Sequence, residues 1–207
     1  MNLPSPALHA QVACQWEATA RKLGNVNRVS DFKNTSLTDF LISAAAIRDP
    51  LEQPAKSIGE TIWNCVAATN QLVGQNTNLG MILLLAPLVH ASVPGDLSTN
   101  LNQQLDELTV GDAIWVYRAI RLANPGGLGT SSTQDVNENP TVTLREAMRL
   151  AEERDLIARQ YGNGFQDVFE FGVPRLVDSF NEHLSLEAAI IDCQLHWMAR
   201  FPDSLIA

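Results

Sequence analysis

The 207-residue sequence predicts an all-α protein, a single compact multi-helix domain around a central apolar helix. Apolar residues recur at helical spacing along most of the chain, and Ser/Thr-x-x-Asp/Glu capping patterns open several of the apolar segments. The period-2 alternation of β-branched residues that is typical of strands is scarce. Hydrophobic residues make up 45% of the chain, so residues 1–207 can bury one core as one domain.

The first three helices are predicted by apolar spacing, by capping pairs and by stop signals. A helix over residues 8–23 carries apolar residues on one side and is expected to end at Gly24. Two further helices, over 36–47 and 57–73, are expected to close at Asp49-Pro50 and at Gly74. The capping pairs that open them are Ser36 with Asp39 and Ser57 with Glu60.

The middle of the chain contains the central helix. Residues 81–91 are apolar on every face, which predicts a buried helix rather than an amphipathic one. A polar helix is expected over 98–108, and the pair Thr109 and Asp112 opens another that runs to about residue 123. The long stretch 124–140 is rich in Gly, Ser, Thr, Asn and Pro, and a loop of that length is usually functional or mobile.

Two long helical segments are expected near the C-terminus. One runs from residue 143 to 161, and the other runs from 186 to 201. Between them, residues 165–171 carry helical signals that stop at Gly172-Val173-Pro174. Cys193 and His196 share a face of the last helix, and we interpret them as ordinary packing residues because a metal site needs three or four ligands.

Composition excludes several classes of function. The net charge of -9 and the pI near 4.8 leave no large basic surface, which argues against broad binding of nucleic acid or anionic membranes. Any phosphate must therefore be held locally. The apolar run at 81–91 is shorter than the roughly 20 residues that span a bilayer. The N-terminus lacks a signal-peptide pattern, and Cys14, Cys65 and Cys193 form no disulfide framework, so a soluble protein in a reducing cytoplasm is predicted.

Three carboxylates are candidates for chemistry. Glu17 lies on a small-residue side of its helix and is either a solvated glutamate or a site residue. Asp39 has a sufficient explanation as part of a capping pair. Asp155 falls on the apolar stripe of the helix predicted over 143–161, and a carboxylate there needs a partner. That partner is an arginine such as Arg118 or Arg121, or a magnesium ion that also holds a triphosphate.

Two segments are candidates for anion binding. Asn76-Thr77-Asn78 precedes the central helix, where free backbone amides and the helix dipole favour a phosphate, although plain N-capping explains the same residues. The loop over 124–130 contains Gly126 and Gly127, which allow backbone amides to converge on an anion. Common nucleotide, zinc and nucleophile motifs are absent.

Taken in order, these segments resemble the triphosphoribosyl-dephospho-CoA synthase family along nearly the whole chain. The matching pieces are Glu17, Lys22-Leu23-Gly24-Asn25-Val26, Arg28, Asp31, Asp39-Phe40, Asn76-Thr77-Asn78-Leu79-Gly80, Pro125 to Gly129, Asp155, Gln160-Tyr161, Phe165 and Pro202-Asp203-Ser204-Leu205-Ile206. Leu23 replaces a proline of the family pattern, and Asn78 and Leu79 replace a histidine and a lysine. These replacements leave the identity of the acceptor open. The end at Ala207 fits either a short or a trimmed form.

The resemblance implies an all-helical enzyme that uses ATP with Mg²⁺, releases adenine and makes 2'-(5''-triphosphoribosyl)-3'-dephospho-CoA. It implies small nucleotide and coenzyme substrates, and a homodimer stays open. Glu17, Asp155 and Asp39 are the implied catalytic residues, and Glu17, Asp31 and Asp155 are the implied metal ligands. The implied contacts to nucleotide are Lys22, Gly24, Asn25, Arg28, Asn76, Thr77, Asn78, Gly80, Gly126 and Gly127.

We expect Glu17 and Asp155 to face the same cavity, because each is predicted on or beside the buried side of its helix. Two other classes of function remain. One is a different nucleotide-dependent group transfer in coenzyme assembly, which would keep the donor site and change the acceptor. The other is a non-catalytic helical interaction protein, which would bind no Mg-ATP.

Overall fold

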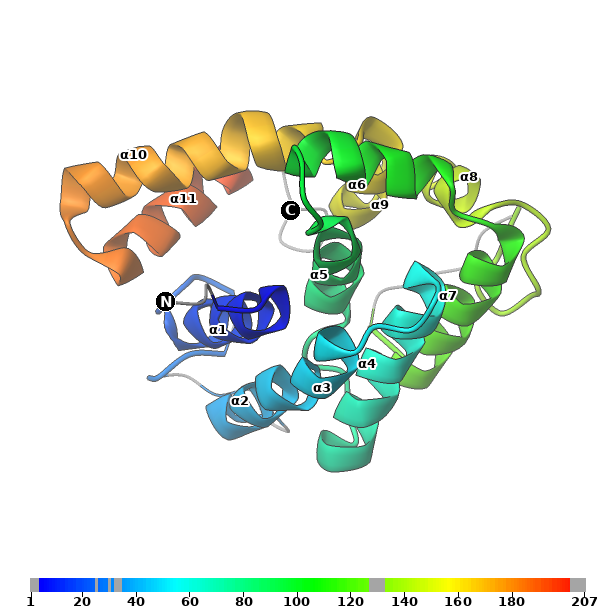
Figure 1. Cartoon of the computed structure of the whole chain (residues 1–207). Coiled ribbons are helices and arrows are strands. Elements are labelled where there is room, and N and C mark those ends of the chain that lie inside the picture. Colours follow the sequence, from blue (N-terminus) through cyan, green and yellow to red (C-terminus); the bar gives the residue numbers. More distant parts are fainter. Residues whose placement is uncertain (1–3, 25, 30, 32–34, 127–132, 202–207) are drawn as a thin grey trace.

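The computed structural model describes residues 4–24, 26–29, 31, 35–126 and 133–201, and these ranges contain helices but no β-strand, which confirms the all-α prediction (Figure 1). None of these helices is both long enough and apolar enough to cross a membrane. In chain order they are α1 (Pro6–Thr19), α2 (Leu37–Ala46), α3 (Arg48–Glu52), α4 (Ile58–Val73), α5 (Leu79–Ala91), α6 (Leu97–Asp106), α7 (Val110–Ala123), α8 (Leu144–Arg149), α9 (Leu156–Asn163), the π-helix η1 (Val168–Gly172), α10 (Val173–His183) and α11 (Leu186–Arg200).

The apolar helix α5 is central, as predicted. It packs against α1, α4, α6 and α9, and each of its residues is buried or partly buried. The most extensive pairing in the molecule is between α4 and α7, which run side by side. Ile62 of α4, Ile82 of α5 and Val116 of α7 are almost completely inaccessible to solvent and belong to the core that these helices share.

The predicted capping pairs open their helices. Ser36 with Asp39 and Thr109 with Asp112 form reciprocal capping boxes, and Ser57 Oγ accepts a hydrogen bond from the Glu60 N–H at 3.2 Å. The first helix ends at Thr19, four residues before the expected position. α5 begins at Leu79 rather than at residue 81.

Asp49-Pro50 does not end the helical region as predicted. Both residues lie inside α3, which follows α2 directly. Pro50 occupies the third position of α3, and the first N–H groups of a helix have no intrahelical acceptor. The proline therefore removes no helical hydrogen bond.

The single helix predicted over 143–161 is wrong. The chain forms α8, then turns over residues 150–154, and then forms α9. Asp155 has an extended backbone and caps α9 by accepting hydrogen bonds from the N–H groups of Ile157 and Ala158. Local capping by a short acidic side chain thus outweighs the apolar spacing, and Asp155 is exposed rather than placed on a buried stripe.

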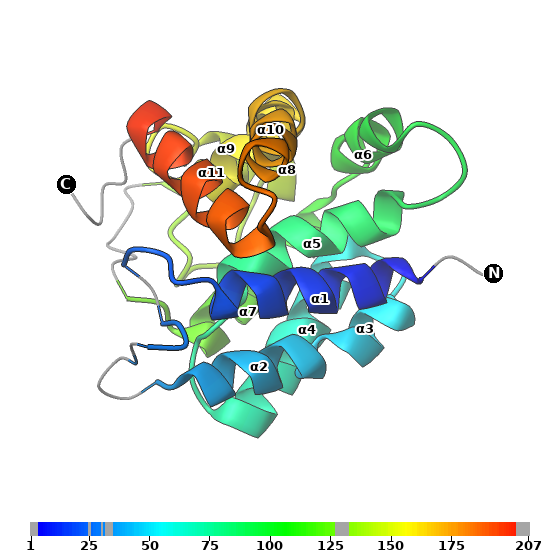
Figure 2. The same cartoon turned by 90° about the vertical axis from the view of Figure 1, so that its left-hand side faces the viewer.

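The stop predicted at Gly172-Val173-Pro174 is also wrong, and α10 was missed. Pro174 occupies the first turn of α10, which follows the π-helix η1 directly, and the Val173 N–H still donates to the Val168 carbonyl, so the helical path continues. α10 and α11 form an antiparallel hairpin that packs mainly on itself and lies next to α1 on one side of the molecule (Figures 1 and 2).

Candidate functional site

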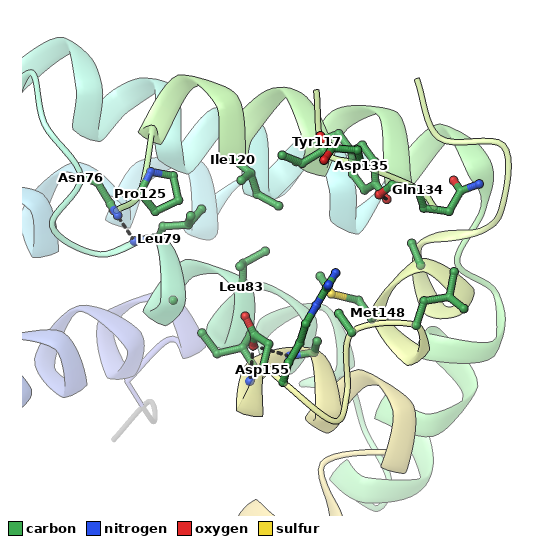
Figure 3. Close-up of a pocket in the computed structure, with 18 of the residues that line it drawn as sticks. Asn76, Leu79, Leu83, Tyr117, Ile120, Pro125, Gln134, Asp135, Met148 and Asp155 are labelled. Atoms are coloured by element: carbon green, nitrogen blue, oxygen red, sulfur yellow. Dashed lines mark hydrogen bonds between the residues drawn. The ribbon is translucent and has the colours of Figure 1, made fainter. Parts of the chain in front are cut away.

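A cavity of about 510 Å³ lies between α5, α7, the connection from α7 to α8, and the α8 to α9 region (Figure 3). This volume is in the range of about 300–1,000 Å³ that holds one drug-sized molecule. Its lining residues are Asn76, Leu79, Gly80, Leu83, Tyr117, Ile120, Pro125, Gly126, Thr133, Gln134, Asp135, Val136, Ala147, Met148, Leu150, Ala151, Arg154, Asp155, Ile157 and Ala158.

The start of α5 forms one wall of this large cavity. Asn76 Oδ1 accepts a hydrogen bond from the Leu79 N–H at 3.2 Å, so the predicted N-cap is present. Within the described ranges, the N–H groups of Gly80 and Met81 have no hydrogen-bond acceptor. Because the N-terminal end of a helix carries partial positive charge, this wall suits an anion.

Gly80 also allows two helices to approach each other. A Cβ atom at this position would lie 2.9 Å from Ile157 Cδ1 of α9. The missing side chain therefore permits contact between α5 and α9 at the edge of the cavity.

Asp155 and Arg154 provide charge on the facing wall. Asp155 Oδ1 accepts the hydrogen bonds from Ile157 N–H at 2.7 Å and Ala158 N–H at 2.9 Å, and no described group donates to its Oδ2. The Arg154 guanidinium is exposed and makes no ion pair or hydrogen bond with the described part of the chain. One carboxylate oxygen and one arginine are thus available to a ligand.

Tyr117 and Asp135 lie close together on the opposite side (Figure 3). The Tyr117 hydroxyl donates a hydrogen bond to the Gln134 carbonyl at 2.9 Å. Burial, and then the negative charge of Asp135, raise the pKa of Tyr117, so it remains a protonated donor at neutral pH. Tyr117, Asp135 and Arg154 were not predicted from the sequence, where the only pointer to Asp135 was its place in the long polar loop.

The cavity brings together four residues that were predicted from three separate segments: Asn76, Gly80, Gly126 and Asp155. Thr77 and Asn78 instead contact Ser43 and so connect the turn before α5 to α2. Thr77 Oγ1 lies 2.5 Å from Ser43 Oγ, and Asn78 Nδ2 donates to the Ser43 carbonyl at 3.2 Å. Two other predicted contacts, Asn25 and Gly127, lie outside the described residues.

A second group of predicted residues lies around the connection from α1 to α2. Glu17 forms an ion pair with Lys22, and Gly24 adopts a φ of 76° that favours glycine. Neither Glu17 nor Lys22 lines the large cavity, so the structure does not bring Glu17 and Asp155 to one cavity as we expected.

The remaining predicted residues of that group also have structural partners. Arg28 pairs with Glu187 of α11, Asp31 Oδ1 accepts from the Leu37 N–H, and Asp39 belongs to its capping box. The assignment of Asp31 and Asp39 to metal binding or catalysis stays a prediction. The Arg118 and Arg121 side chains, considered as partners of Asp155, instead contact Trp115 and the Val136 carbonyl.

One cluster of potential metal ligands occurs within the described ranges: Glu182, His183 and Asp192. Arg175 already lies between two of these groups, with Nη2 2.5 Å from an oxygen of Asp192 and 3.4 Å from one of Glu182. The hydrogen bonds from Arg175 and Ser179 lower the pKa of Asp192 to about 2. The cluster is therefore already balanced by a cation and lies apart from the large cavity.

The family comparison identifies the chain. The sequence profile of ATP:dephospho-CoA triphosphoribosyl transferases matches residues 4–207. The chain belongs to this family. The resemblance found on the sequence segments is thereby confirmed, and the chain is an enzyme of the transferase class.

A solved structure supports membership of the transferase family. The crystal structure of a candidate triphosphoribosyl-dephospho-CoA synthase from Archaeoglobus fulgidus superposes with a TM-score of 0.63 and is 27% identical in sequence. The match covers 80% of this chain and 72% of the archaeal chain. No curated protein matches this chain significantly.

Proposed function

We propose that this transferase moves the 5'-triphosphoribosyl group of ATP to dephospho-CoA and that the large cavity holds the ATP. The observation that carries the proposal is that Asn76, Gly80, Gly126 and Asp155, which come from three distant parts of the chain, line one cavity of nucleotide size in a family member. Glu17 does not line this cavity, and its assignment to catalysis or metal binding stays a prediction.

The lining of the cavity matches the two ends of ATP. The side chains of Leu83, Ile120 and Met148 offer an apolar surface for the adenine base. The Arg154 guanidinium and the free N–H groups at the start of α5 are the donors for the triphosphate. A protein with a net charge of -9 needs such local donors.

In the proposed reaction, the oxygen of an acceptor hydroxyl forms a bond to C1' of the ATP ribose, and the bond from C1' to adenine breaks. Adenine leaves with the electron pair and takes up a proton, and the hydroxyl proton passes to a base. Positive charge develops at C1' in the transition state, and a carboxylate nearby stabilises it. Asp155 has one free oxygen in this cavity, which serves either this role or the binding of a metal ion.

The residues present fit a magnesium ion bound together with ATP. Mg²⁺ in nucleotide sites is usually held by one or two carboxylates and by the phosphates of the substrate. Asp155 Oδ2 offers one such oxygen. When bound, the ion would offset the negative charge of the triphosphate.

The decisive experiment incubates the protein with Mg-ATP and dephospho-CoA and detects free adenine and the triphosphoribosylated product by mass spectrometry. Both must appear, and each must require the acceptor. Adenine release only with another coenzyme acceptor would favour a different group transfer, as the replacements at Asn78 and Leu79 allow. Absence of both ATP binding and adenine release would contradict the proposal.

Arg154 tests the location of the site. Replacing Arg154 by glutamine removes a charge-assisted contact to phosphate, so KM for ATP should rise about tenfold or more while the fold is retained. Arg149 is an exposed arginine that does not line the cavity, and Arg149→Gln is the matched control. If Arg154→Gln and Arg149→Gln had the same KM for ATP, the large cavity would not be the ATP site.

We also infer that the protein forms a homodimer through α10. Three apolar residues of this helix and its C-cap residue are 45–81% exposed, and they follow one another at intervals of four, three and four residues. The four are Val173, Val177, Phe180 and Leu184. This spacing is the same in both directions, so two antiparallel copies of α10 would oppose Val173 to Leu184 and Val177 to Phe180, as a two-fold interface requires.

Light scattering coupled to size exclusion tests the dimer. Val177→Glu should convert a dimer to a monomer, because it places two like charges near the two-fold axis. Leu72→Glu is the control, since Leu72 is similarly exposed but lies on α4. A monomeric wild-type protein at tens of micromolar would rule this interface out.

We place the protein in a reducing compartment, the cytoplasm. Cys14, Cys65 and Cys193 are all buried and free. Burial raises the pKa of Cys14 and Cys65 to about 12, which keeps both as unreactive thiols.

A further inference from the structure

A second cavity, of about 320 Å³, lies between the end of α1, the connection to α2, and the first turns of α11. It shares no lining residue with the large cavity. Figure 2 shows α11 beginning next to α1. The lining residues are Trp16, Thr19, Ala20, Arg28, Leu186, Glu187 and Ile190.

The second cavity has a flat aromatic surface. Trp16 is 49% exposed, and no described ring or guanidinium stacks on its indole. The other three tryptophans each contact an aromatic ring. Leu186 and Ile190 continue the apolar surface on α11. A base that stacked on Trp16 would cover this exposed surface.

Positive charge lies at the edge of the same cavity. Arg28 Nη2 contacts both carboxylate oxygens of Glu187, at 2.8 and 2.7 Å, and Arg21 Nε contacts one of them at 3.1 Å. Two guanidiniums therefore share one carboxylate, which leaves a surplus positive charge in an acidic protein. Both arginine side chains are more than half exposed, so a phosphate can reach them.

We propose that the second cavity binds an adenosine diphosphate group, with the base on Trp16 and the phosphates on Arg28 and Arg21. Two kinds of molecule carry this group: a free nucleotide, and a coenzyme acceptor of the dephospho-CoA type. The second source rests on the proposed function. The large cavity has room for one nucleotide, so another substrate needs a surface of its own.

The cavity adjoins the segment that connects to the ATP site. The connection from α1 to α2 contacts the turn before α5 through Thr35 Oγ1 and Gln75 Oε1, which are 3.2 Å apart. The same turn carries Asn76 of the large cavity.

Fluorescence of the full chain tests the site, with ADP and dephospho-CoA as separate probes. A base that stacks on an indole quenches the fluorescence of that tryptophan, so both probes should quench the fluorescence of the wild type. Trp16→Phe should lose most of this quenching, although three other tryptophans remain. Arg28→Gln should raise the Kd on the order of tenfold. Arg118 is an exposed arginine of α7 that lines neither cavity, so Arg118→Gln should leave the Kd unchanged.

Glu187→Gln should change the Kd in the direction opposite to Arg28→Gln. Removing the shared carboxylate charge leaves two uncompensated guanidiniums, so the Kd for both probes should fall several-fold. A purely structural ion cluster would instead give weaker binding in both variants, and that result would overturn the proposal, as would quenching that survives in Trp16→Phe.

Comparison of the two probes distinguishes a free nucleotide from the acceptor as the ligand. It also distinguishes a failure of this proposal from a failure of the proposed function. If the acceptor is the ligand, Arg28→Gln raises KM for dephospho-CoA and leaves KM for ATP unchanged. If free ADP is the ligand, the variant changes ADP binding alone. A wild type that makes no product but shows the expected ADP quenching would contradict the proposed function and leave this site intact.

Discussion

At the scale of single residues, Asp155 has two roles that the structure makes separable. One carboxylate oxygen caps α9, and the other is available to a ligand of the large cavity. Asp155 is exposed and has no arginine partner among the described residues, so it is not part of a buried ion pair. Its contribution to stability is that of an N-cap.

Substitution by asparagine and by alanine separates the two roles of Asp155. Asparagine caps helices about as well as aspartate, so Asp155→Asn should keep the melting temperature, while Asp155→Ala should lower stability by about 1 kcal/mol. Both variants should lose transferase activity by at least tenfold if the free oxygen holds the metal-bound nucleotide.

Asp96 provides the control for this comparison. It caps α6 through the Thr99 N–H at 2.8 Å and does not line the large cavity. Asp96→Asn should therefore retain full activity. An active Asp155→Asn enzyme would limit Asp155 to its capping role.

At the scale of elements, the α4 to α7 pairing depends on a close backbone approach. A Cβ atom on Gly59 would lie 2.5 Å from the Asp112 carbonyl oxygen and 2.6 Å from its Cα. The Gly59 N–H also donates to Asp112 Oδ1 at 2.9 Å. Burial would raise the pKa of Asp112, but the hydrogen bonds from Thr109 and Gly59 outweigh it and hold the pKa below its usual range.

Gly59→Ala should destabilise the protein by about 1–3 kcal/mol, because the obstructing atoms belong to the backbone and cannot rotate away. Thermal unfolding should show a fall of roughly 3–10 °C. Gly111→Ala is the matched control in α7, since its Cβ would meet only the Thr109 hydroxyl at 3.3 Å. If the two variants had the same melting temperature, the close backbone approach at Gly59 would not be needed for the packing of α4 on α7.

At the scale of the whole molecule, the α10 to α11 hairpin is joined to the body by few contacts. Arg21 and Arg28 bind Glu187, and Gln194 Nε2 donates to the Leu23 carbonyl at 3.0 Å. The hydrogen bond from Arg28, followed by those from Arg21, lowers the pKa of Glu187. Glu187 therefore contributes to docking above the pKa of an unfolded glutamate, about 4.3, and loses this contribution as the pH falls through its lower folded value.

Acidification should thus weaken the contact of the first turn of α11 with Arg21 and Arg28, while the hairpin stays folded and Gln194 still joins α11 to Leu23. Asp192, which holds α10 to α11 through Arg175, has a pKa of about 2 and remains charged when Glu187 is protonated. Hydrogen exchange, corrected for intrinsic rates, should show reduced protection near Glu187 as the pH falls below about 4.3 and through the lowered pKa of Glu187, while the interior of the hairpin stays protected. Glu187→Gln should remove this pH dependence, and an unchanged profile in that variant would assign it to other groups.

The sequence by itself determined the all-α class, the family, the central position of α5 and most helix starts. These features depend on local physics: side chains cap their own helices, as Ser36 and Thr109 do, and an element that is apolar on every face must be buried. The family followed from the order of short segments, because order along the chain is a property of the sequence.

Only the tertiary structure decided which of the candidate residues meet. Asn76, Gly126 and Asp155 share a cavity, while Glu17 and Arg28 pair with Lys22 and with the distant Glu187. Prediction of helix boundaries from the sequence was wrong at Asp155, where capping competed with apolar spacing. It was also wrong at Pro50 and Pro174, which lie in the first turns of helices. In each case the outcome depends on contacts across the fold or on the competition between local hydrogen bonds and burial, and neither is fixed by spacing along the chain.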